Sequence, residues 1–343
     1  MAKVDVGDIA DGALGLVLVV EAAEEDVARD AHERLDRGGV LRCRDPHGRL
    51  GRRHGPNLLR SRRAYDGGVP ELPEVETIRR RLAPVLEGAT IAQAEIVDPR
   101  LTRPVEPSHV ADALVGETIV SLDRRGKYLL WRLASGRTLV VHLRMTGSFR
   151  HGPGGELPDD AHRRATLALD TGDAIGYRDV RRFGTWELLD EDHLRPYLAT
   201  RLGPEPLAPS FTAARLASLA EGRTAPVKAF LLDQRRIAGV GNIYADEALW
   251  RARIHPLRPA GSLDDHELAT LHRGVRAALR KGIERQGSTL TDYVTPDGER
   301  GGMQHEFHVY GRLGEPCDRC GSPIERIVVA GRGTWFCPHC QRR

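Results

Sequence analysis

Aromatic residues are scarce in this chain of 343 residues, at 5% of the sequence, so aliphatic side chains must fill most of any core. Long apolar runs are also missing. None approaches the ~20 residues of a membrane-spanning helix, and the run at 15–20 has acidic flanks, unlike a secretory signal. The net charge is only +3, so a surface for a polyanion would have to be built from placed side chains. These absences favour an intracellular, soluble protein, and the length allows two domains.

Cysteine is rare too, and all but Cys43 lie close to the carboxyl end, at Cys317, Cys320, Cys337 and Cys340. This clustering favours a metal site over a disulfide framework. The spacing gives two C-x2-C pairs, and four thiolates presented this way suit a tetrahedral Zn²⁺ ion. The alternative is a redox use of the two pairs. Because protein sulfurs would fill every position, we expect one structural zinc.

Residues 1–69 differ in character from the rest of the chain. A strand at 14–20 and an acidic helix at 22–35 are possible, but no core is long enough to hold them. The stretch 41–65 is rich in arginine, with Gly and Pro scattered through it. It is either a basic tail that binds phosphates or a leader that is disordered or results from a misassigned start, and we favour the leader.

The block Pro70-Glu-Leu-Pro-Glu74 has two interpretations. Pro and Glu are common in the first turn of a helix, which is the structural interpretation. A proline at a free amino terminus is instead a secondary amine, and an α-amino group titrates near pH ~8, which makes it a usable nucleophile. Val69 precedes the block, and a GTG codon can initiate translation in bacteria. We therefore hypothesise that Pro70 is the mature amino terminus.

Periodicity divides the remainder into a β-rich part and a helical part. Apolar residues at helical spacing over 73–86 are followed by short β-type runs, at 90–96, 117–122, 128–133, 138–143, 165–170 and 185–188. A Gly- and Pro-containing linker follows at 201–208. Helical spacing then dominates, at 211–220, 226–234, 242–253 and 264–285. The pattern predicts a β-sandwich or barrel, then a helical domain that ends in a cysteine-bearing hairpin.

Several Gly-flanked basic or polar residues are suited to binding phosphates. Asn242 follows a glycine-rich turn and opens a predicted helix, whose free N–H groups could face an anion. Lys228 on the preceding helix could supply a matching cation. Lys127 follows Gly126 at a strand start, and Arg332 lies between glycines in the cysteine hairpin. Each feature alone is also common in tight turns and solvated strand ends.

Two further segments combine Arg and Gly with one apolar side chain. They run from His142 to Gly147 and from Val180 to Gly184, with Met145 and Phe183 as the apolar members. Such side chains could wedge into a base stack. A place in the core is the plainer interpretation of both.

Taken together, these motifs resemble the formamidopyrimidine-DNA glycosylase family from Pro70 to the carboxyl end. The matching pieces are PELPEVE, RRGKYLL, HLRMTGS, RDVRRFG, GPEPL, LLDQRRIAGVGNIYADEALW, HVYGR and the cysteine pairs with VAGRGT. Leu72 and Val240 favour this family over its sister, endonuclease VIII. The resemblance implies an α+β fold: a β-sandwich catalytic domain with a leading helix (70–200), the linker (201–208), a helix-two-turn-helix DNA-binding domain (209–300) and a zinc finger (301–343).

The resemblance also implies a function and residue roles. The protein would excise oxidised purines, 8-oxoguanine and formamidopyrimidines, from duplex DNA and cleave the abasic strand by β,δ-elimination. Pro70 would form a Schiff base, Glu71 would act as the acid and base, and Glu74 would support the site. The implied phosphate contacts and DNA-binding or gap-filling side chains are Lys127, Lys228, Asn242, Arg332, His142, Met145, Arg181 and Phe183.

Two alternatives stay open from the residues. A protein of the same fold could act on oxidised pyrimidines, and a chain with a blocked Pro70 could bind DNA without catalysis. We expect a zinc-containing monomer that acts on damaged double-stranded DNA in the bacterial cytoplasm, at the nucleoid, and has no membrane partner.

Overall fold

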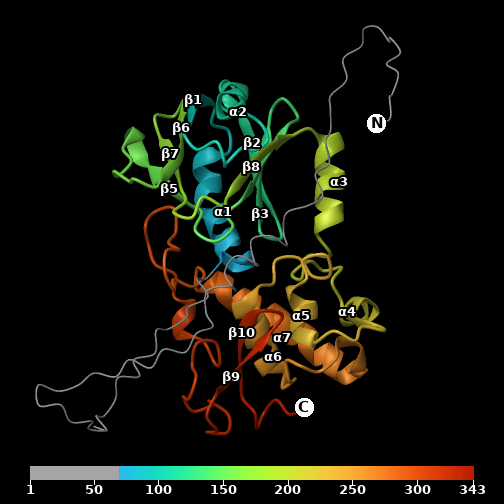
Figure 1. Ribbon diagram of the computed structural model, residues 1–343. Coiled ribbons are helices and arrows are strands. Elements are labelled where there is room, and N and C mark those ends of the chain that lie inside the picture. The colour runs from blue at the N-terminus through green and yellow to red at the C-terminus, as the bar shows by residue number, and fades with distance from the viewer. Residues whose placement is uncertain (1–68) are drawn as a thin grey trace, which may run out of the picture. The chain divides into compact units, whose positions relative to one another are not determined.

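The computed structural model describes residues 69–343 (Figure 1). The predictions for the extension, namely the strand at 14–20, the helix at 22–35, the basic stretch at 41–65 and Cys43, lie outside the described residues. Within 69–343, no helix combines the length and the apolar character needed to cross a membrane.

The chain enters the folded part through helix α1, Leu72–Leu86. A capping box starts it: the Glu71 side chain accepts the N–H of Glu74, while the Glu74 carboxylate accepts the N–H of Glu71 at 3.0 Å. Its buried residues include Leu72, Val75, Ile78, Leu82 and Leu86, which follow the predicted helical spacing. The helix packs against strand β2 and helix α7. The first turn of α1 thus fixes two carboxyl groups inside the protein.

Two antiparallel four-stranded sheets follow, in the orders β2-β3-β4-β8 and β1-β6-β7-β5. Their strands are β1 (Ile91–Ile96), β2 (Ile119–Arg125), β3 (Tyr128–Leu133), β4 (Thr138–His142), β5 (Ser148–Gly152), β6 (Arg163–Leu169), β7 (Ala174–Arg178) and β8 (Thr185–Leu189). Each predicted β run lies on one of them. Strands β5 and β7 were missed, because glycines and polar residues interrupt their alternation.

The few aromatic residues gather between these sheets. Trp131 on β3 and Trp186 on β8 lie against Phe149 on β5 and Tyr177 on β7, with ring centroids 5.1–6.5 Å apart. All four side chains are almost completely buried. The contact of rings from both sheets confirms the predicted sandwich.

Helices and a short hairpin make up the rest. They are α2 (Pro107–Leu114), α3 (Glu191–Arg201), α4 (Ala213–Ala220), α5 (Val227–Leu232), α6 (Asn242–Ala252) and α7 (Asp265–Glu284), with 3-10 turns η1 (Pro153–Gly155), η2 (Ala260–Ser262) and η3 (Met303–His305), and strands β9 (Glu325–Val329) and β10 (Arg332–Phe336). The helices expected between 211 and 285 are confirmed, whereas α2 and α3 were not predicted. Figure 1 shows the β9–β10 hairpin beside α6 and α7.

The predicted linker at 201–208 is held in place by ion pairs. The Glu205 carboxylate accepts the N–H of Gly126 at 2.5 Å and pairs with Arg124 and Arg125 on β2. On its other side, the N–H of Gly203 donates to the Gln234 carbonyl at 2.8 Å. The segment therefore ties the turn that carries Lys127 to the turn that precedes α6.

Candidate active site

A cavity of about 570 Å³ collects most of the predicted site residues. Those that line it are Glu71, Lys127, His142, Met145, Phe183, Asn242 and Arg332. They come from the start of α1, the β2–β3 turn, the end of β4, the β4–β5 and β7–β8 loops, the start of α6 and the β9–β10 hairpin. Pro70 is buried directly before Glu71. Residues more than 250 positions apart in the sequence, such as Glu71 and Arg332, thus meet around one space.

Glu71 lies at the amino end of α6, although it belongs to another part of the chain. Its carboxylate accepts the N–H of Ile243 at 2.9 Å and that of Tyr244 at 3.4 Å. Gly241 permits this approach, because a Cβ there would lie 2.3 Å from the Glu71 carboxyl carbon. Two of the N–H groups at this helix start, those of Ile243 and Tyr244, therefore bind an internal carboxylate. Burial raises the pKa of Glu71, and the charge of Lys127 partly opposes that rise.

Glu74 lies next to Glu71 and is equally buried. Its Oε1 accepts the Tyr244 hydroxyl at 2.9 Å and the N–H of Ser288 at 2.8 Å. Burial, followed by the charge of Glu71, raises the pKa of Glu74 to about 7. The pair can therefore hold a proton at neutral pH, as groups that exchange protons must.

Lys127 and His142, both from the sheet domain, line the same cavity as Glu71. Lys127 is partly buried in the β2–β3 turn, and desolvation lowers the pKa of its amine while the Glu71 charge opposes that shift. His142 ends β4, and burial lowers its pKa to about 3, so the imidazole is neutral. Its Nδ1 accepts the N–H of Arg144 at 3.0 Å. Only Lys127 of these two brings positive charge to the cavity.

Lys228, which we expected to contact phosphate, binds protein groups in this structure, and its contact with phosphate stays a prediction. The side chain is fully buried, and its Nζ lies 2.7 Å from Asp246 Oδ1, where it also donates to Thr334 Oγ1 at 2.8 Å. A further hydrogen bond of 3.0 Å reaches the carbonyl of Gly333, which also accepts the Asn242 amide at 3.0 Å. Lys228 thus holds the hairpin from inside, while its neighbour Arg332 is exposed.

The predicted wedge side chains lie on two adjacent loops. Phe183 is 48% exposed, which is unusual for a large aromatic, and the Arg181 guanidinium lies 4.9 Å from its ring centroid. Met145, on the other loop, is half-buried. The loops are joined, because the N–H of Arg181 donates to Thr146 Oγ1 at 2.9 Å. The alternative that Phe183 fills the core is therefore wrong.

The four clustered cysteines fit one zinc ion. Their sulfurs all lie within 4.8 Å of one another, and the Cys320 and Cys337 sulfurs are 3.5 Å apart. A tetrahedral Zn²⁺ with Zn–S bonds of ~2.3 Å requires sulfur separations of ~3.8 Å. The Trp250 indole N–H donates to Cys317 Sγ at 3.4 Å, which ties the set to α6. No open position remains, so a metal here would be structural.

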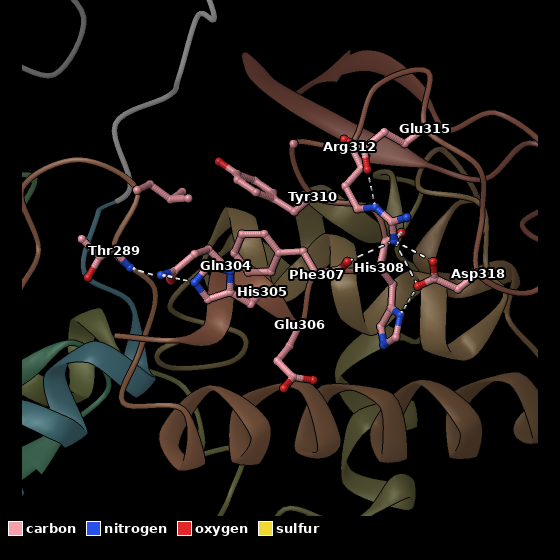
Figure 2. A pocket seen from close by; sticks show the side chains of 12 residues that line it. Thr289, Gln304, His305, Glu306, Phe307, His308, Tyr310, Arg312, Glu315 and Asp318 are labelled. Atoms are coloured by element: carbon pink, nitrogen blue, oxygen red, sulfur yellow. Dashed lines mark hydrogen bonds and ion pairs between the residues drawn. The ribbon is translucent and has the colours of Figure 1, made fainter. Parts of the chain in front are cut away.

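A second cavity, of about 670 Å³, adjoins the first through Tyr310, which lines both. Figure 2 shows Thr289 and Gln304 at one end, Phe307 in the middle, and the Arg312 and Asp318 side chains at the other end. The charges at that end are paired, with Arg312 Nη1 2.9 Å from Asp318 Oδ1. Gln304 Oε1 accepts the N–H of Thr289 at 3.0 Å, which orders the segment between α7 and β9.

Sequence reasoning missed Tyr244, Ser288 and Tyr310. Tyr244 and Ser288 bind Glu74, and Tyr310 lines both cavities. The NIYADEALW and HVYGR segments contain the two tyrosines, yet nothing in their spacing reveals which side chain they touch. Ser288 lies just after α7, at the start of the segment that leads to η3.

Family models match nearly all of the described residues. The formamidopyrimidine-DNA glycosylase N-terminal domain matches 69–186, the formamidopyrimidine-DNA glycosylase H2TH domain matches 202–294, and the zinc finger found in FPG and IleRS matches 314–343. The last match, with the four clustered sulfurs, identifies one structural zinc.

Curated relatives and solved structures agree with these matches. The formamidopyrimidine-DNA glycosylases of Roseiflexus sp. (strain RS-1) and Geobacillus kaustophilus (strain HTA426) are 48% and 47% identical, and each aligns over 80% of this chain and 100% of its own length. The MutM (Fpg) crystal structure from Thermus thermophilus is 48% identical, with a TM-score of 0.71 over 79% of this chain and 98% of that one. Lactococcus lactis Fpg with abasic-site DNA is 40% identical, with a TM-score of 0.74 over 80% of this chain and 100% of that one. This chain belongs to the formamidopyrimidine-DNA glycosylase family.

Proposed function

We propose that this protein removes oxidised purines, 8-oxoguanine and formamidopyrimidines, from duplex DNA and then cleaves the abasic strand. The observation that carries the proposal is Glu71, a buried carboxyl with a raised pKa that lies directly beside Pro70 and lines a cavity. Solved relatives support the substrate class, since Lactococcus lactis Fpg has been crystallised with Fapy-dG DNA and with abasic-site DNA.

Catalysis requires Pro70 to carry a free amine, so we propose it as the mature amino terminus. The family match begins at residue 69, and relatives are covered over their full length by 80% of this chain. Inside a longer chain, the same nitrogen is an amide without a usable lone pair.

The chemistry divides between Pro70 and Glu71. The proline amine attacks the sugar C1′, the bond from C1′ to the base breaks, and the base leaves with a proton. Glu71 donates its proton to the ring oxygen, which opens the sugar and leaves a Schiff base on Pro70. Loss of the C2′ proton then expels the 3′ phosphate, and a second elimination expels the 5′ phosphate. The raised pKa of Glu71 suits the acid role at neutral pH.

Binding the lesion requires the base to leave the stack, which costs a few kcal/mol, roughly. Met145, Arg181 and Phe183 would fill the gap and hold the unpaired base. Lys127, Lys228, Asn242 and Arg332 would bind the DNA backbone beside His142, and Glu74 would support the active site. The domain boundaries given by the sequence, 70–200, 201–208, 209–300 and 301–343, remain part of this proposal, as do a monomeric state and action in the cytoplasm.

Borohydride trapping tests the proposal. A protein that begins at Pro70 should form a covalent adduct with a duplex containing 8-oxoguanine opposite cytosine, and release the base. The same protein with one alanine placed before Pro70 is the matched control and should form none. Absence of any adduct or strand cleavage with the free-proline protein would support non-catalytic DNA binding. Faster excision of thymine glycol would instead favour the oxidised-pyrimidine alternative.

A further inference from the structure

Arg182 lies between the two wedge residues Arg181 and Phe183 but turns toward a different partner. Its Nε and Nη2 donate to the two oxygens of Asp98 at 2.5 and 2.7 Å. Its backbone has φ +61°, in the left-handed region that side chains other than glycine rarely adopt. The two neighbouring arginines therefore differ in their surroundings. Arg181 is exposed beside Phe183, whereas Arg182 is bound to Asp98.

Asp98 comes from a distant segment, just after β1, and its side chain is only 3% exposed. It also accepts the N–H of Arg100 at 3.0 Å, and Arg164 Nε lies 3.9 Å away. A buried carboxylate that loses its cation is costly, so the Asp98–Arg182 pair strongly favours the left-handed backbone that it requires. The loop from Val180 to Gly184, called the wedge loop below, is therefore held by the side chain of Asp98, which lies outside it.

A second buried carboxylate holds the same loop from its other side. Asp179 accepts the Thr146 hydroxyl at 2.5 Å and the N–H of Gly184 at 2.7 Å. Thr146 in turn accepts the N–H of Arg181. Asp98 and Asp179 thus fix the backbone on both sides of Phe183, and Thr146 links it to the loop that carries Met145.

We propose that Asp98 is a positioning residue that fixes the conformation of the wedge loop before DNA binds. By fixing this loop, Asp98 sets how strongly the enzyme discriminates between bases opposite the lesion. The inference rests on the proposed function. A loop already held in its bound shape loses less conformational entropy on binding. It also holds Arg181 in one orientation toward the opposite base, so only one partner is well accommodated.

Single-turnover excision with three variants tests this role. Asp98→Asn removes the charge, Asp98→Glu keeps it, and Asp123→Asn breaks an exposed pair with Arg132 as the matched control. Substrates are 8-oxoguanine opposite cytosine, 8-oxoguanine opposite adenine, and a pre-formed abasic site. For Asp98→Asn we expect a roughly tenfold loss of excision opposite cytosine, a smaller loss opposite adenine, and unchanged abasic-site cleavage. Asp98→Glu should recover part of the discrimination, and the control should match the wild type.

The ratio of excision opposite cytosine to excision opposite adenine decides the inference. If Asp98→Asn leaves this ratio unchanged, whether both rates fall equally or neither falls, the inference is overturned and the proposed function stands. A wild-type protein that neither excises the lesion nor cleaves the abasic site would overturn both. If Asp98→Asn does not fold, Arg182→Lys replaces it, because lysine keeps the charge but cannot make the two-pronged contact. Its ratio of cytosine to adenine excision should fall in the same way, and an unchanged ratio would overturn the inference.

Discussion

The start of α1 and the segment beneath the wedge loop both bury carboxyl groups, with Glu71 and Glu74 at the first and Asp98 at the second. Their surroundings differ. Glu71 and Glu74 accept mainly backbone N–H and hydroxyl groups, and burial raises the pKa of both. Asp98 accepts a two-pronged guanidinium from Arg182, which lowers its pKa despite the burial.

The comparison separates two uses of a buried acid. A buried carboxyl that accepts only N–H and hydroxyl groups has a raised pKa, which favours the protonated form that can give a proton to a substrate. A carboxyl bound to arginine stays ionised and acts as an anchor for the backbone around its partner. Burial alone does not tell the two apart, whereas the identity of the donor does.

The largest expected effect comes from Glu71→Gln, which removes the proton donor. Loss of a general acid costs about 10²–10⁴ in rate, so excision of 8-oxoguanine should fall by that much in single-turnover assays. Glu95→Gln, which changes an exposed glutamate on β1, should leave the rate unchanged. If Glu71→Gln excises the base at the wild-type rate, this carboxyl transfers no proton. The contrast between Glu71 as a proton donor and Asp98 as an anchor would then fail.

Glu74→Gln should change how stability depends on pH. The folded carboxyl titrates near pH 7 instead of 4.5, so from pH 4.5 upward only the unfolded state releases the proton. The free energy of unfolding of the wild type should therefore fall by about 3 kcal/mol relative to that of the variant as pH rises from 4.5 through 7. Urea unfolding at several pH values measures the difference. A difference that does not vary with pH would mean that Glu74 is ionised in the folded protein.

Asp98→Asn should change the dependence of stability on pH in the opposite direction. The folded carboxyl has a pKa below its ordinary value of 3.8, so its stabilising contribution is present above that pH and is lost as pH falls through the folded value. The stability advantage of the wild type over Asp98→Asn should shrink in acid. Urea unfolding of Asp123→Asn provides the exposed-pair control. A growing advantage in acid would contradict the role of Asp98 as an ionised anchor.

The smallest effect is expected for Tyr244→Phe. The hydroxyl donates to Glu74 Oε1, so its removal should cost about 1 kcal/mol. Removal of the hydroxyl should also raise the pKa of Glu74 further. The pH range over which stability falls as Glu74 ionises should then move upward. Tyr177→Phe is the control, since that buried hydroxyl makes no hydrogen bond among the described residues. Equal losses in the two variants would show that Glu74 gains nothing from Tyr244.

Motif spacing predicted the parts of the site that are local in the chain. The C-x2-C pairs indicated the sulfur cluster, the helical period indicated α1, and the runs at 128–133 and 138–143 lie on β3 and β4. Lys228 shows the limit. The motif around Lys228 predicts a phosphate contact, which stays a prediction, but it does not reveal that Asp246 on α6 and Thr334 on β10 bury the side chain. Only the packing of distant segments decides whether a lysine beside a glycine-rich turn faces solvent.

The sequence by itself determined the order of elements, the residue types available for chemistry and the metal ligands, because periodicity, turn residues and cysteine spacing act over short stretches. Tertiary structure decided which carboxyls hold protons. The backbone N–H groups that meet Glu71 come from Ile243 and Tyr244, and the guanidinium that meets Asp98 comes from Arg182. A pKa depends on burial and on the nearest donors. Burial raises the pKa of Glu71 although these N–H groups oppose the rise, and the Arg182 guanidinium lowers the pKa of Asp98. Both sets of donors lie far away in the sequence.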